Sequence, residues 1–510
     1  MERQVSDLAL VWDVRMDQGE PHPTGVSGRV VARSLAWSGS GAILMRVGQL
    51  VVGIAAARIM SARDFGIFAI TMVVYAIVVN VSELGVGSAL IREHDDLESL
   101  GPTAVTLAMI SATSLAAIMA ATAPLLGPLL GSPASIAPIQ VMSLVVLLAG
   151  PTSVPSALMT RDFRQDLRFR ADVANFLVGN ALLITLAIFG WGALALAWSR
   201  VAGQATSAIV LLVLDRHRFR PGWQRPAAAH LIRFGTPLMG SNMISFAKSN
   251  LDSIVIGRIR GPIPLGGYTL ANNVAAWPIG VLEPILINVG LPLVSRLRTN
   301  RIALVKFLQQ ALGLLAGGFF LASAMIAALS GPLVRALYTD KWAAAIPILA
   351  ILALAGPFRA LLDVMSDVLM ACQASRSVFA INLVWIATLL PLMIVGVIVD
   401  GPLGAAFAQL LTLTLVVAPV ALLRVSRVTA VGLREMSRGV ARPLLAASAA
   451  AISAHFASLL LTSPWLGLMI GGLVGLAVFA LLAWGWLRTT VSDIRDQLRT
   501  GSPAGVEGAP

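Results

Sequence analysis

The sequence predicts an all-α polytopic membrane protein with about fourteen transmembrane helices, arranged as two six-helix lobes followed by two C-terminal helices. Of the 510 residues, 57% are hydrophobic and only 12% are charged, which is far more apolar than an ordinary soluble domain. Apolar runs of about 20 residues recur along the chain, and each is long enough to cross about 30 Å of hydrocarbon as a helix. The connections between these runs are short, so no soluble domain interrupts them.

The fourteen expected spans define the organisation of the chain. They lie near residues 34–57, 67–90, 103–125, 136–159, 172–190, 193–214, 236–257, 267–294, 308–330, 344–370, 377–399, 402–423, 443–462 and 465–487. The stretch RHRFRPGWQRPAAAH (216–230) is the longest polar connection and predicts a boundary between lobes. The expected segments are a disordered cytosolic tail (1–32), an N-lobe (33–215), a cytosolic linker (216–235), a C-lobe (236–426), a cytosolic amphipathic segment (427–442), the last two spans (443–488) and a cytosolic tail (489–510).

The basic residues indicate the topology. The chain has 37 Lys and Arg against 25 Asp and Glu, which gives a formal net charge of +12. If the N-terminus lies in the cytosol, most of these basic residues fall in cytosolic loops and tails, as the positive-inside rule expects. We therefore expect both termini in the cytosol, and we interpret the basicity as a topology signal rather than as a nucleic-acid-binding surface.

A weak internal repeat supports two lobes in the same orientation. A shift of 200 residues places Arg33 opposite Arg233, Arg58 opposite Arg258, Gly66 opposite Gly266 and Glu83 opposite Glu283. Rare charged residues thus coincide at equivalent points of the first two spans of each lobe. Transporters that are built from two repeated lobes bind their substrate between the lobes and alternate its access by rocking.

Ionisable residues inside the spans are the main functional candidates, because a charge at the centre of a span costs roughly 2.5 to 3.5 kcal/mol on insertion scales. Arg46 lies 13 residues beyond Arg33, and Lys248 lies 15 residues beyond Arg233. Each cation is therefore expected near the midplane of the first span of its lobe. Two cations that faced a common cleft would form an anion site.

Other polar residues in the spans share helical faces. Asp252 follows Lys248 by four residues, and Asp363 follows Arg359 at the same spacing. Such residues either serve function or form neutral pairs that hold helices together. The remaining candidates are Arg200, Glu83, Glu283, Asp367, Asn250, Asn272 and Asn273.

The sequence argues against several kinds of chemistry. Its single cysteine, Cys372, excludes an intramolecular disulfide, and no cluster of Cys and His has the spacing of metal ligands. We therefore expect no metal and no cofactor. The external loops are short and carry no clustered acid/base pair, which argues against an enzyme such as a polysaccharide polymerase or ligase.

Four stretches resemble a known family in order and spacing. They are ARIMSARDFGIFAITMVV (57–74), SELGVGSALIREHD (82–95), SNLDSIVIGRIRGPIPLGGYTLANNV (249–274) and LVRALYTDKWAAAIPILAILALAGPFRALL (333–362). They are similar to the polysaccharide-transporter branch of the multidrug/oligosaccharidyl-lipid/polysaccharide (MOP) flippase superfamily. The resemblance covers about residues 33 to 426 and includes the basic residue in the first span, which matches Arg46.

The resemblance implies a flippase in the bacterial inner membrane, with two lobes around a cationic cavity. Its substrate would be an undecaprenyl-diphosphate-linked oligosaccharide for exopolysaccharide, O-antigen or capsule synthesis, and its partners would be membrane lipid, a coupling proton or sodium ion, and the polysaccharide polymerase machinery. The expected diphosphate ligands are Arg46, Lys248, Arg359 and Arg200. The expected coupling residues are Asp252, Glu83, Glu283, Asp363 and Asp367, and the expected sugar contacts are Asn250, Asn272 and Asn273.

Three alternatives stay open on the sequence alone. The first is a cation-coupled small-molecule antiporter of the same fold, which would favour fewer cations in its cavity. The second is a flippase for a peptidoglycan lipid precursor, which sequence separates poorly from the first choice. The third, an enzyme of the polysaccharide pathway, is the least favoured because of the short external loops.

Overall fold

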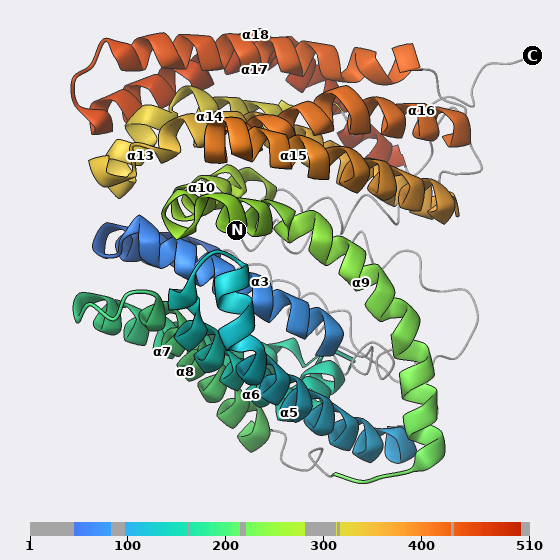
Figure 1. Ribbon diagram of the computed structural model, residues 1–510. Coiled ribbons are helices and arrows are strands. Elements are labelled where there is room, and N and C mark those ends of the chain that lie inside the picture. Colours follow the sequence, from blue (N-terminus) through green and yellow to red (C-terminus); the bar gives the residue numbers. More distant parts are fainter. Residues whose placement is uncertain are drawn as a thin grey trace, which may run out of the picture. The chain divides into compact units, whose positions relative to one another are not determined.

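The computed structural model describes residues 45–82, 97–161, 164–214, 221–280, 313, 317–429 and 433–500 (Figure 1). Within these ranges the regular structure is helical, and no strand occurs. Helices satisfy every backbone hydrogen bond within one segment, which a chain this apolar needs in a bilayer. The predicted all-α membrane class is confirmed.

The chain forms two compact units, residues 1–249 (unit 1) and residues 250–510 (unit 2). The division between them falls inside helix α9 (Arg225–Arg260), which is continuous over 36 residues. A helix of this length extends about 54 Å, well beyond the hydrocarbon core of about 30 Å. The sequence predicts a linker at 216–235 and a span at 236–257, whereas the helix begins at Arg225 and includes the end of that linker.

Unit 1 is a bundle of antiparallel helices. Its described helices are residues 45–59, α3 (Ala62–Ser82), α5 (Leu97–Leu129), α6 (Ile136–Arg161), α7 (Gln165–Ile188), α8 (Ala193–Leu214) and the first part of α9. The most extensive packing joins α5 to α6 and α7 to α8 (Figure 1). An aliphatic core joins α3, α5, α6 and α8, with Met119, Ile139 and Met142 almost fully buried among Val74 and Ala123.

Glycines allow α7 and α8 to approach closely. A methyl group at Gly203 of α8 would contact the Asn175 side chain and lie 3.0 Å from the Asn175 carbonyl oxygen on α7. A methyl group at Gly179 of α7 would lie 3.0 Å from the Ser199 carbonyl oxygen on α8. Small residues at such crossings are typical of helix pairs in membranes, where close van der Waals packing drives association.

The middle of the predicted linker, at residues 222–224, is hydrogen-bonded to the start of α5. The Gly222 amide donates to the Pro102 carbonyl oxygen at 3.0 Å, and the Thr106 hydroxyl donates to the Gly222 carbonyl oxygen at 2.7 Å. The Gln224 amide donates to the Thr103 hydroxyl at 3.1 Å. The first turns of α9 then bury Leu231 against α5 and α6. This packing explains why a helix begins at polar residues that carry no span signal.

Unit 2 holds the rest of the described helices. They are the end of α9, α10 (Pro262–Ala275), residues 317–328, α13 (Ser330–Tyr338), α14 (Ala345–Ala371), α15 (Ser375–Leu411), a π-helical stretch (Thr412–Val417), α16 (Ala418–Thr429), α17 (Leu433–Leu459) and α18 (Pro464–Thr500). Helices α17 and α18 pack side by side along their length (Figure 1). Their contact buries Ala447, Ala450 and Phe479.

Helix α15 turns sharply at Asp400 and Gly401, where the backbone leaves the helical region. Gly401 has a φ of +58°, which favours a residue without a Cβ. The Arg260 side chain donates to the carbonyl oxygens of Val397 at 3.0 Å and Ile398 at 2.6 Å, shortly before the turn. The turn coincides with the predicted break between the spans 377–399 and 402–423.

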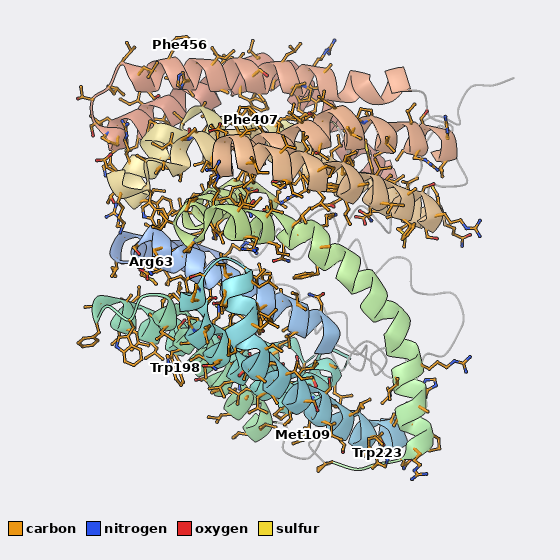
Figure 2. The ribbon with its side chains drawn as sticks, viewed as in Figure 1. Arg63, Met109, Trp198, Trp223, Phe407 and Phe456 are labelled. Atoms are coloured by element: carbon orange, nitrogen blue, oxygen red, sulfur yellow. The ribbon has the colours of Figure 1, made fainter. Side chains whose placement is uncertain are left out.

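Eight helices in the described part of the chain are long and apolar enough to cross a membrane. The number is nine if residues 317–328 and α13, which meet at 71°, are counted as one span. Several of these helices expose large apolar side chains, such as Met109 on α5 and Phe407 on α15 (Figure 2). Phe456 is exposed on α17. Such exposure suits contact with lipid. The count of fourteen spans stays a prediction.

Candidate functional site

A buried carboxylate lies at the centre of the polar network of unit 2. Asp252, near the end of α9, is only 8% exposed. Its Oδ1 accepts a hydrogen bond from the Ser253 amide at 2.7 Å and another from the Ser253 hydroxyl at 3.4 Å. Tyr268 and the positive charge of Arg359 act on its carboxylate electrostatically. A buried charge of this kind needs partners because its desolvation is costly.

Tyr268 joins helices α10 and α15. The ring of Tyr268, on α10, is 1% exposed, and its hydroxyl donates to Oε1 of Gln409 on α15 at 3.1 Å. Gln409 is itself buried, with 4% of its surface exposed. Asp252, Tyr268, Gln409 and Arg359 thus come from α9, α10, α15 and α14. We call these four side chains the unit 2 network.

A small cavity adjoins the unit 2 network. Its volume is about 20 Å³, and its polar lining comes from Asn272, Arg359 and Gln409. Gly356, one turn before Arg359 on α14, also lines this space. A cavity of this size has room for about one water molecule and is too small for a sugar.

A hydroxyl group beside Gly356 has no hydrogen-bond partner among the described residues. Ser323 is 1% exposed, and its Oγ lies 3.4 Å from the position that a Cβ of residue 356 would occupy. Thr412 Oγ1, at the start of the π-helical stretch, is also buried and without a partner in the described part of the chain. Buried polar atoms of this kind are usually satisfied by ordered water.

Two of the predicted cations lie on exposed surfaces of unit 1. A methyl group at Gly48 would contact the Phe176 ring at 2.6 Å, so this face of the 45–59 helix packs on α7. Arg46 precedes Gly48 by two residues, which places it about 200° around the helix, on the face away from α7. Its side chain is exposed. Arg200 on α8 is exposed as well.

The other predicted site residues are distributed over both units. Lys248 is partly buried on α9 in unit 1. In unit 2, Asn250, Asn272 and Asp363 are partly buried, whereas Asn273 and Asp367 are exposed. Glu83 and Glu283 lie outside the described residues. Of the twelve predicted residues, the structure associates three with the unit 2 network or its cavity, namely Asp252, Arg359 and Asn272.

Sequence reasoning missed Tyr268, Gln409 and Ser323. Tyr268 precedes Asn272 by one helical turn and is one of only 3 tyrosines in the chain. A rare polar ring on the same helical face as a candidate residue could therefore have indicated Tyr268 as a further site residue. Gln409 and Ser323 carry no such signal, since an uncharged polar residue in a span is common.

A comparison with known protein families decides the family of this chain. Residues 55–347 match a family described as polysaccharide biosynthesis protein. The protein belongs to this family. The match includes the end of the 45–59 helix, all of α9 and α10, and thus Asp252 and Tyr268 of the unit 2 network.

Individual relatives are consistent with that family. The chain is 24% identical over 381 residues to the lipopolysaccharide biosynthesis protein WzxC of Escherichia coli, in an alignment that covers 74% of this chain and 77% of the relative. It is 28% identical over 346 residues to the succinoglycan biosynthesis transport protein ExoT of Rhizobium meliloti, with coverage of 64% and 67%. The second relative is described as a transport protein, which agrees with the prediction that the chain is a transporter rather than an enzyme.

The fold is shared with a solved flippase. The structure aligns with lipid II flippase MurJ in an inward closed conformation at a TM-score of 0.69, covering 90% of this chain and 100% of that chain. The two sequences are 13% identical, so the likeness establishes the fold alone. This chain therefore has the helical fold of that protein.

Proposed function

We propose that this protein is a flippase that moves an undecaprenyl-diphosphate-linked oligosaccharide across the bacterial inner membrane during polysaccharide biosynthesis. The observation that carries the proposal is the family match over residues 55–347. The flippase fold and the relatives in lipopolysaccharide and succinoglycan biosynthesis support it. The sugar would cross within the protein while the isoprenoid chain stays in the lipid.

In the proposed mechanism, intramembrane cations hold the diphosphate. A diphosphate loses its hydration in the membrane and needs charge-assisted hydrogen bonds in return. We assign this role to Arg46 and Lys248, with Arg200 adding to the field. The exposure of Arg46 on the helix face away from α7 favours this role, because intramembrane Arg residues face cavities rather than lipid.

The remaining predicted residues complete the proposal. Asn250, Asn272 and Asn273 can donate and accept hydrogen bonds with sugar hydroxyl groups. Glu83, Glu283, Asp363 and Asp367 stay candidates for coupling to a proton or sodium gradient, since a carboxylate can exchange partners when an anionic substrate arrives. We further propose that both termini lie in the cytosol, as the distribution of basic residues favours.

A second candidate is a flippase for a peptidoglycan lipid precursor. The fold likeness to lipid II flippase MurJ favours it, although the sequence identity of 13% carries no substrate information. The two candidates share a lipid-linked diphosphate and differ in the sugar. Complementation of a strain that lacks its lipid II flippase separates them, because only the second candidate restores growth.

The experiment that tests the proposal is complementation of a deletion strain. We expect the deletion to accumulate a lipid-linked oligosaccharide and the wild-type gene to clear it. Arg46→Ala and Lys248→Ala, present at normal membrane levels, are expected to clear it at least about tenfold more slowly, a loss of about 1.4 kcal/mol in transition-state stabilisation. The control is Arg335→Ala, because Arg335 is 57% exposed and pairs with the exposed Asp340 at 3.6 Å. Full activity of both Arg46→Ala and Lys248→Ala would contradict the anion-site assignment.

A further inference from the structure

We infer that one structural water molecule binds in the small cavity of unit 2, where it joins Ser323 of the 317–328 helix to Gln409 of α15. The ligand of this site is water rather than an ion. Its role is to complete the hydrogen bonds of buried groups on neighbouring helices, which goes beyond the proposed function and does not depend on it.

The Ser323 hydroxyl is the group that requires a ligand. The residue is 1% exposed, and its Oγ has no hydrogen-bond partner among the described residues. A serine in a helix often donates to a carbonyl of its own helix, as Ser366 of α14 does to Leu362 at 2.8 Å. Ser323 makes no such bond within the described part of the chain. A buried hydroxyl without a partner is costly, so an ordered water is the expected partner.

Gly356 of α14 leaves the space that this water needs. A Cβ at residue 356 would lie 3.4 Å from Ser323 Oγ and 3.8 Å from the Ala275 carbonyl oxygen. Gly356 and Ala275 both line the cavity, whose volume of about 20 Å³ holds one water molecule. A water oxygen that is displaced slightly from the Cβ position towards Ser323 is within hydrogen-bonding distance of the hydroxyl.

Two other helices supply polar groups to the same space. Gln409 lines the cavity, and its Oε1 already accepts a hydrogen bond from Tyr268, which leaves its Nε2 group as a donor. Arg359 on α14 and Asn272 on α10 line the cavity as well. A buried water usually makes about three hydrogen bonds, and Ser323, Gln409 and Arg359 provide that number. The water thereby connects the unit 2 network to the 317–328 helix.

The lining favours water over an ion. Asp252 and Asp363 are not among the lining residues, so no carboxylate is present as a ligand for a hard cation, and Arg359 places a positive charge at the cavity wall. A chloride ion is larger than a water molecule, for which the cavity is just large enough. Chloride can only accept hydrogen bonds, whereas water can also donate to the acceptor atoms of Ser323 and Asn272.

The test is the sign of two changes in the melting temperature of the purified full-length protein in detergent. Gly356→Ala places a methyl group where the water binds, and we expect the variant to melt at least about 2 °C below the wild type. Without a water, the same change would stabilise the protein, because the methyl group would fill empty space and Ala favours a helix over Gly. Gly101→Ala is the matched control, since Gly101 also precedes a proline within a helix and a methyl group there meets open space. This control should not melt below the wild type.

Ser323→Ala tests the other side of the site. It removes a hydroxyl that bonds the water, and we expect a melting temperature at least about 2 °C lower. Without a water, the variant would melt higher than the wild type, because an unsatisfied buried group is removed. Ser366→Ala is the control, since it loses a bond within its own helix and should shift the melting temperature less. The double variant Ser323→Ala/Gly356→Ala should melt no lower than Gly356→Ala, because no hydroxyl is then left without a partner.

Three outcomes would overturn the inference. The first is a melting temperature of Ser323→Ala above that of the wild type, and this sign decides alone if Gly356→Ala does not accumulate. The second is a double variant whose loss is the sum of the two single losses, because the two positions would then share no ligand. The third is a stabilisation of the wild type in NaCl over sodium gluconate that Ser323→Ala abolishes, because the ligand would then be chloride. No substrate is present, so each result leaves the flippase proposal to its own complementation test.

Discussion

The two units of the protein bury polar groups in different ways. Among the described residues of unit 1, every buried polar side chain is a Ser or a Thr. Several of these donate to a backbone carbonyl of their own helix, such as Thr71 to Ile67 at 3.0 Å and Ser199 to Leu196 at 2.8 Å. In unit 2, the buried set includes the charged Asp252 and the amide of Gln409, and Gln409 accepts a hydrogen bond from Tyr268 on another helix.

This difference indicates how the two units divide their tasks. Hydroxyl groups that bond within one helix add little specificity between helices, so unit 1 depends on aliphatic packing and on glycine crossings. Arg46 and Arg200, the arginines of unit 1 that are predicted to bind the substrate, are exposed. Unit 2 keeps a charged group in its interior at a cost in desolvation, and such groups are retained where they serve specificity or a switch.

The largest expected effect is the loss of the buried carboxylate. Asp252→Ala removes a buried carboxylate that accepts from the Ser253 amide and hydroxyl and on which the charge of Arg359 acts, and we expect a loss of about 3 kcal/mol in the free energy of unfolding. Thermal denaturation in detergent measures this loss. Asp340→Ala is the matched control, because Asp340 is 88% exposed in its pair with Arg335, and exposed pairs contribute about 0–1 kcal/mol. Equal effects of the two variants would contradict the contrast between the units.

A smaller effect is expected from the glycine crossing in unit 1. Gly203→Ala places a methyl group against Asn175 of α7, and we expect it to destabilise the protein by about 1–3 kcal/mol. Gly101→Ala on α5 is the control, since a methyl group at that position would meet open space. Melting temperatures of both variants provide the measurement. A neutral Gly203→Ala would mean that α7 and α8 do not depend on their close approach.

Loss of the Tyr268 hydroxyl is expected to cost less. Tyr268→Phe keeps the buried ring but leaves Gln409 Oε1 without this donor, for a loss of about 1–2 kcal/mol in the free energy of unfolding. The variant Gln409→Glu, which keeps an acceptor but adds a second negative charge, should be less stable than Tyr268→Phe. Thermal denaturation of both variants in detergent provides the comparison. If Tyr268→Phe melts with the wild type, the hydroxyl does not link the helices of unit 2.

The smallest effect is expected from Thr71→Val in unit 1. The change removes one hydroxyl that bonds within its own helix, and we expect a loss below about 1 kcal/mol in the free energy of unfolding. Transport in the complementation assay should be unchanged. A loss of stability as large as that of Tyr268→Phe would show that unit 1 also depends on its buried polar groups.

The sequence predicts elements well where their signal is local. The apolar runs predict the helical class, and the turn at Asp400 and Gly401 falls between two predicted spans. The start of α9 at Arg225 could not be predicted, because its helix depends on packing of Leu231 against α5 and α6 rather than on an apolar run.

The unit 2 network shows a second limit of sequence reasoning. Helical spacing relates residues three or four positions apart, so it places Lys248 with Asp252 and Arg359 with Asp363. The structure places Arg359 of α14 and Asn272 of α10 on the lining of one small cavity, and it joins Tyr268 to Gln409, which are 141 positions apart. Contacts between helices depend on their rotation and register, which no local pattern specifies.

The flipping of a lipid-linked oligosaccharide is tested most directly in proteoliposomes. The purified protein is reconstituted with an undecaprenyl-diphosphate-linked oligosaccharide, and cleavage of the sugar by a glycosidase added outside is followed. We predict that the cleaved fraction rises from about half to nearly all of the lipid with the wild type, and that Arg46→Ala/Lys248→Ala stays near half. Equal cleavage in liposomes without protein and with the wild-type protein would contradict the proposed function.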